Sequence, residues 1–183
     1  MANKVTRITA IVVLVLVAIP GCKKNYREWE EQFTPIRKSL SAVEDKLTAI
    51  PAKTELAPHP SIKGKIVVFN RKNKLGKYEQ ANYYYRELIE IYATKPDEVG
   101  TVALLDCNET QKGFYKTAEG KEYPALVEDC GLTIIDHAKA AVIFRKMFEK
   151  TPAATQKVSK SGSVFSQSAF EDVTAFLKGL PRT

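Results

Sequence analysis

The chain has a helical pattern from Tyr26 to Ile50, and its apolar positions repeat with a helical period between residues 35 and 50. Thr34 suits the N-cap position of a helix, and Pro35 suits its first turn. From there, apolar residues recur in alternating steps of four and three, at Ile36, Leu40, Val43, Leu47 and Ile50. The spacing predicts an amphipathic helix over 35–50, which either packs on the protein's own sheet or forms a coiled coil with a protein partner.

Residues 51–60 contain three prolines, which end this periodicity and predict a linker. Beyond the linker, Ile66 to Phe69 is apolar on both faces, as is typical of a central strand. Further strands are predicted over 99–106, 112–116, 125–136 and 140–148. The short links between these strands favour antiparallel pairing.

Two further helices are predicted. In residues 81–92 the spacing of Tyr84, Leu88 and Ile91 favours a helix, although the consecutive tyrosines also suit a strand. After a polar, basic loop over 151–167, Ser168 and Glu171 form a capping box for a C-terminal helix. The patterns together predict an α+β fold: a mainly antiparallel sheet of about four to five strands, with an N-terminal amphipathic helix and a C-terminal helix packed on it.

The first 21 residues have the layout of an export signal. Lys4 and Arg7 precede an uncharged apolar run from Ile8 to Ile19. This run is shorter than the roughly 20 apolar residues that a membrane-spanning helix needs. An uncleaved signal anchor is the alternative, because two lysines follow the run on its far side, Lys23 and Lys24.

The residues that follow the apolar run resemble the lipobox of bacterial lipoproteins. Ile19 fits its aliphatic position and Gly21 its small residue, whereas Pro20 stands where Ala, Ser or Val is usual. The resemblance implies that Cys22 becomes the lipid-modified first residue of the mature protein, tethered to the membrane by its acyl chains. Lys23, in place of Asp, implies retention in the outer membrane, facing the periplasm, in a cell that has one.

The expected organisation has three parts: a signal peptide over 1–21, a lipid-anchored helical stalk and proline-rich linker over 22–60, and a single α+β domain over 61–183. The succession of EVGTVALLDC, CGLTIID, VIFRKMF and FLKGLP along this domain is similar to uncharacterised bacterial extracytoplasmic proteins. That similarity implies an architecture and no activity.

The chain has three cysteines, an odd number for an exported protein. Lipid modification of Cys22 leaves Cys107 and Cys130, which an oxidising compartment can keep as a disulfide. Closing that loop contributes roughly 3 to 4 kcal/mol. Two unpaired buried thiols or a metal site are the alternatives, but no CxxC spacing is present, and His59 and His137 are isolated in sequence.

The formal net charge of +7 does not predict a nucleic-acid partner. Two of these charges, on Lys4 and Arg7, lie in the predicted signal peptide, and the other lysines are mostly interleaved with Asp and Glu. Such interleaving is typical of a solvated surface. The remaining excess suits weak attraction to an anionic membrane.

The sequence contains no catalytic motif such as GxSxG, HExxH or a phosphate-binding glycine loop, so no catalytic residue, metal or cofactor is predicted. We expect a membrane-anchored lipoprotein that acts as a non-catalytic binding or structural module in the cell envelope. One alternative is a small envelope hydrolase with a site at the strand ends, where Asp106, Asp129, Asp136 and His137 could converge. Another is a redox sensor built on Cys107 and Cys130, which would need an accessible disulfide.

Overall fold

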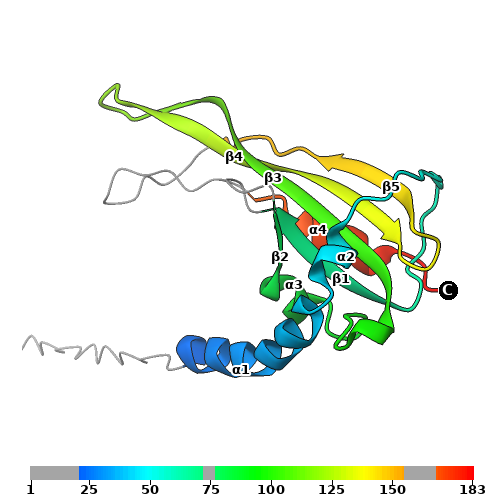
Figure 1. Cartoon of the computed structure of the whole chain (residues 1–183). Coiled ribbons are helices and arrows are strands. Elements are labelled where there is room, and N and C mark those ends of the chain that lie inside the picture. The colour runs from blue at the N-terminus through cyan, green and yellow to red at the C-terminus, as the bar shows by residue number, and fades with distance from the viewer. Residues whose placement is uncertain (1–20, 72–76, 155–167) are drawn as a thin grey trace, which may run out of the picture.

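The computed structural model describes residues 21–71, 77–154 and 168–183, with the side chains of 21–27 outside that description. The predicted signal peptide and most of the 151–167 loop therefore lie outside the described residues. Along the chain, the helices and strands (Figure 1) are α1 Gly21–Ser41, α2 Glu44–Thr48, β1 Lys65–Arg71, β2 Tyr78–Gln80, α3 Asn82–Glu87, a 3-10 turn Pro96–Glu98, β3 Val99–Lys116, β4 Glu122–Asp136, β5 Ala141–Phe148 and α4 Phe170–Gly179.

The sheet has five strands in the order β2-β1-β3-β4-β5, and all neighbours are antiparallel except β1 and β3. The predicted α+β class with a mostly antiparallel sheet is confirmed, together with the C-terminal helix. The parallel pair arises from the connection between β1 and β3. β2 folds back along the outer side of β1, and the chain then passes through α3 to begin β3 beside the first residue of β1. In Figure 1, α2 crosses in front of the sheet and α4 lies behind it.

β1 is the apolar centre of the fold. Its residues Ile66, Val67, Val68 and Phe69 are all 0% exposed, which confirms the prediction of a strand buried on both faces. Burying side chains of this size contributes roughly 1.5–3 kcal/mol each. Val173 and Leu177 of α4 belong to the same core, so the C-terminal helix covers part of this strand system.

The N-terminal helix begins at Gly21, before the helical pattern that starts at Tyr26, and it continues through the start that Thr34 and Pro35 predict. Pro35 lies inside α1, and the Thr34 hydroxyl donates to the Glu30 carbonyl oxygen at 2.7 Å, so Thr34 does not cap the helix. A proline inside a helix costs about 3 kcal/mol. The turns of α1 that precede Pro35 are stabilised by aromatic contacts. The rings of Trp29 and Phe33 pack on the Tyr85 ring, with centroids 6.2 and 5.3 Å from it.

The apolar face of the predicted 35–50 helix is occupied within the protein. Ile36 and Leu40 of α1 and Leu47 of α2 are buried in the same core as β1. The helix breaks after Ser41 and resumes at Glu44, so it is not continuous to residue 50. Most of the apolar stripe of this helix therefore already packs on the fold. A protein partner for the helix stays a prediction.

The proline-rich segment runs along the outer edge of β5. The amide of Glu55 donates to the Val142 carbonyl and that of Ala57 to the Ile143 carbonyl, both at 2.8 Å, and the Val142 amide donates to the Lys53 carbonyl at 3.0 Å. These are strand-type contacts, so residues 53–57 cover an edge that would otherwise be open. The predicted linker is thus bound to the sheet along this stretch.

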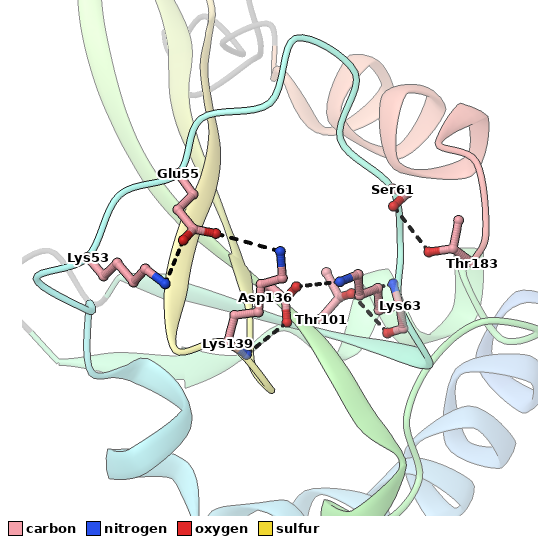
Figure 2. A network of polar contacts seen from close by, with 8 residues as sticks. All are labelled: Lys53, Glu55, Ser61, Lys63, Thr101, Asp136, Lys139 and Thr183. Carbon is pink, nitrogen blue, oxygen red and sulfur yellow. Dashed lines mark hydrogen bonds and ion pairs between the residues drawn. The ribbon is translucent and has the colours of Figure 1, made fainter.

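The end of that segment is fastened by the polar network drawn in Figure 2. Lys63 Nζ lies 2.8 Å from Asp136 Oδ2, and the Lys139 amide donates to Asp136 Oδ1 at 3.1 Å. The Thr101 hydroxyl accepts from the Lys63 amide at 2.9 Å and donates to its carbonyl at 3.0 Å. Gly100 permits this approach, because a Cβ there would lie 2.1 Å from the Lys63 carbonyl oxygen.

Asp136 is ionised at neutral pH despite its burial. Its side chain is 2% exposed, and burial alone would raise its pKa. The hydrogen bonds from Lys63 and Lys139 and the charges of both lysines outweigh burial and hold the pKa below its usual value. The ion pair therefore stabilises the fold above the ordinary carboxyl range, and this stabilisation is lost as the pH falls through the folded-state pKa.

We expect Asp136→Ala to lower the free energy of unfolding at neutral pH by roughly 2 to 3 kcal/mol, because it leaves the Lys139 amide and Lys63 without their acceptor. The loss should shrink as the pH falls below the ordinary carboxyl range and through the lower folded-state pKa of Asp136, where the wild-type carboxylate becomes protonated. Urea unfolding followed by circular dichroism measures both values.

Glu122→Ala is the matched control, since it removes the exposed Lys116–Glu122 ion pair, whose side chains are 71% and 48% exposed. Its effect should stay within about 0.5 kcal/mol. Equal losses for the two variants would show that the Asp136 network does not hold the segment.

Candidate functional site

β3 and β4 are longer than the strands beside them. Their pairing runs from Thr101↔Asp136 to Lys116↔Glu122, whereas β1 pairs with β3 only as far as Leu105 and β5 pairs with β4 only as far as Cys130. Residues 108–129, here called the arm, form a two-stranded ribbon that projects beyond the sheet (Figure 1). Within the described residues no other strand pairs with its edges.

The base of the arm carries the two cysteines predicted to pair. Cys107 and Cys130 face each other in the register of β3 and β4, with Cα atoms 4.1 Å apart and sulfur atoms at disulfide-bonding distance. Cys130 is 1% exposed, and Cys107 is half-buried against the core. A disulfide here is compatible with an extracytoplasmic location, and it would lock the register at the point where the sheet ends.

Polar groups on either side of the cysteines brace the arm. Arg71 Nη1 lies 2.7 Å from Asp106 Oδ2 on the sheet side. On the arm side, Lys112 Nζ contacts both oxygens of Asp129 at 3.0 and 2.8 Å, and the Lys150 amide donates to Asp129 Oδ1 at 2.7 Å. The Lys112 and Lys150 hydrogen bonds hold the pKa of Asp129 below its usual value. These contacts connect the arm to the end of β5.

The outer part of the arm, residues 113–124, presents aromatic and basic side chains. Phe114 is 61% exposed and pairs in register with Pro124, and Tyr115 pairs with Tyr123. Lys121 Nζ lies over the Tyr123 ring, 5.0 Å from its centroid. The register is irregular between Gln111 and Phe114, where Gly113 has a φ of +143° that favours glycine. This end of the arm therefore combines exposed apolar area with strand edges that pair with no other strand among the described residues.

The acidic residues considered for a hydrolase do not come together. Asp106 lies opposite Gly131 and Asp136 opposite Thr101, so the two residues are five positions, about 17 Å of backbone, apart along the strands. Asp129 lies beyond the cysteines and is held by Lys112, and His137 is exposed. The aspartates and His137 therefore do not form the shared site that the hydrolase hypothesis requires.

The described part of the chain has neither a metal-binding cluster nor a membrane-spanning helix. Residues 21–71, 77–154 and 168–183 hold no group of three His, Cys, Asp or Glu side chains placed to bind a metal ion. No helix within those ranges is long and apolar enough to cross a membrane. Cys22, the predicted lipid attachment point, is the second residue of α1, and its side chain is outside the description.

The arm is the element that the sequence pattern did not reveal. Residues 112–116 were expected to form a strand separate from 99–106, but β3 is continuous over both. The joining residues 108–111 are polar and exposed on every position, so they have no apolar alternation to mark a strand. The available signal was Pro124, which suits a strand with an open edge.

Comparison with protein-family models, with curated proteins and with solved structures finds no match to this chain.

We expect the Cys107→Ser, Cys130→Ser double variant to lose roughly 3 kcal/mol of unfolding free energy, from the loop entropy that the disulfide removes. The arm should lose more of its hydrogen-exchange protection than β1 does, because β1 keeps neighbours on both sides. Urea unfolding and hydrogen exchange measured by mass spectrometry provide the two readings. Unchanged exchange in residues 108–129 would contradict a clamping role.

Proposed function

We propose that this protein is a membrane-anchored bacterial lipoprotein that acts as a non-catalytic binding module in the cell envelope. In this proposal Cys22 carries the lipid, and the arm contacts a protein partner. The observation that supports it most directly is the arm itself: a ribbon with an exposed aromatic end, built on a cysteine pair, whose edges pair with no other strand in the described part of the chain. Exposed strand edges recruit extended segments of other proteins by strand addition.

The energetics of the arm favour binding over a purely structural role. Phe114 is more than half exposed, and its burial by a partner would recover part of the roughly 1.5–3 kcal/mol that a buried side chain of this kind contributes. Aromatic residues are also the commonest anchors of protein interfaces. Since the disulfide pairs the two strands beforehand, less conformational entropy is lost when the arm binds.

The redox alternative has less support from the same geometry. A disulfide that exchanges with other thiols needs an accessible sulfur. Cys130 is 1% exposed, and Cys107 lies against the core with its sulfur 3.8 Å from Asn70 Oδ1. Burial of this kind suits a cross-link that is formed once and kept.

Cys22→Ala tests the anchor. We expect the variant to lose cleavage before residue 22 and to leave the detergent phase in a Triton X-114 partition, because no acyl chain can be attached. Membrane fractionation with immunoblotting measures length and location together. A variant that stays membrane-bound at full length would support the uncleaved signal anchor.

A photo-crosslinking amino acid at Phe114 tests the arm in intact cells. We expect discrete crosslinked products from this position, and none when the same residue replaces Leu56, an apolar side chain of similar exposure (63%) on the segment beside β5. Crosslinks are read as mass-shifted bands on immunoblots. Identical patterns from the two positions, or no product from Phe114, would rule out the arm as the binding element.

A further inference from the structure

A polar cleft of about 510 Å³ lies between α1 and the outer edge of the sheet. It is open to solvent, and its lining comes from α1, the start of α2, β1, β2 and α3. Apart from Ala81, the lining side chains carry hydroxyl, amide or charged groups. A cleft of this size accommodates a small polar ligand, and neither the arm nor the cysteines contribute to it.

Gln80 gives this cleft an unmet hydrogen-bonding requirement. The residue is 9% exposed, and its Nε2 donates to the Arg37 carbonyl oxygen at 3.1 Å. Its Oε1 is buried and accepts no hydrogen bond. A buried amide oxygen without a donor is a costly arrangement that native proteins rarely retain. This oxygen has almost no exposed surface, so a ligand N–H or O–H group would supply the donor by displacing the side chains that cover it.

The charges around Gln80 indicate which donor fits. Two carboxylates line the same cleft, Glu44 from the start of α2 and Glu79 from β2. The pKa of Glu44 is raised by burial, by Asp45 and by Glu79, so the local field disfavours a second negative charge. A positively charged donor would relieve this repulsion and provide hydrogen bonds at once.

The α1 side of the cleft carries the opposite charge. Arg37 and Lys38 both line it. Arg37 is 3.8 Å from Glu30, beyond hydrogen-bond distance, and Lys38 forms no ion pair within the described ranges. The cleft thus has an acidic wall and a basic wall, which together complement a ligand that carries both an ammonium and a carboxylate.

We infer that this cleft binds an amino acid or short peptide with a free amino terminus. The ammonium group is held by Glu44, Glu79 and the Oε1 atom of Gln80, and the carboxylate faces Arg37 and Lys38. Recognition of terminal amines and carboxylates by such charge-assisted hydrogen bonds is a general mode of peptide binding.

The test is an NMR titration of the isotopically labelled full chain in detergent micelles with triglycine. We expect saturable shifts of the Gln80, Asn82 and Tyr83 amide signals, and a dissociation constant at least about tenfold weaker for N-acetyl-triglycine, which lacks the ammonium group. Glu44→Gln should weaken triglycine binding by a similar factor. Asp45→Asn removes a neighbouring charge that does not line the cleft, and it should change binding less than about twofold.

Three results would overturn the inference: no saturable shift at the cleft with triglycine, equal binding of the acetylated peptide, or shifts produced only by diacetylchitobiose. The last would assign the cleft to saccharides. Since Cys22 and the arm take no part in this binding, failure here would leave the proposed function standing, and failure of the anchor or arm experiments would leave this site standing.

Discussion

The register between β3 and β4 is the constraint on which the rest of the structure depends. One alignment places Cys107 opposite Cys130, Thr101 opposite Asp136 and Lys116 opposite Glu122. A shift of one residue would turn every side chain of one strand to the other face. The buried ion pair at one end of the sheet and the aromatic end of the arm would then be lost together. A cross-link in the middle of this pairing therefore protects both ends.

Features that depend on local apolar pattern could be predicted from the sequence. The run from Ile66 to Phe69 specified a buried strand, and the short link before Ala141 specified a hairpin. The pattern was helical from Tyr26, but Thr34 and Pro35 are good start signals by themselves, so the amphipathic helix was predicted to begin at residue 35 and not at Gly21. The helix extends N-terminal to these two residues, where Trp29 and Phe33 contact the ring of Tyr85, more than fifty residues away in the sequence. Tertiary packing here outweighs local preference.

The two candidate sites differ in how far sequence reasoning could reach them. The pairing of Cys107 with Cys130 was predicted because the lipobox resemblance gave Cys22 a separate role and left an even number of cysteines, and the structure places the two sulfur atoms at disulfide-bonding distance. The polar strand that continues β3 into the arm carries no periodic signal. The cleft is harder still, since Arg37, Glu44 and Gln80 come from three elements and meet only when α1 crosses the edge of the sheet. Neither the composition of the chain nor the spacing of its residues predicts that these three side chains line one cleft.

Residues 53–57 are attached to β5, and Lys63 is attached to Asp136. These contacts limit how far the domain can move from the N-terminal end of the chain. A proline-rich segment between an anchor and a domain normally acts as a spacer. Here that segment is bound along its course, and α1 of 21 residues, about 30 Å long, packs on the domain as well. A lipid on Cys22 would thus be joined to the sheet through a helix that packs on the domain from Trp29 onward, and not through a flexible spacer.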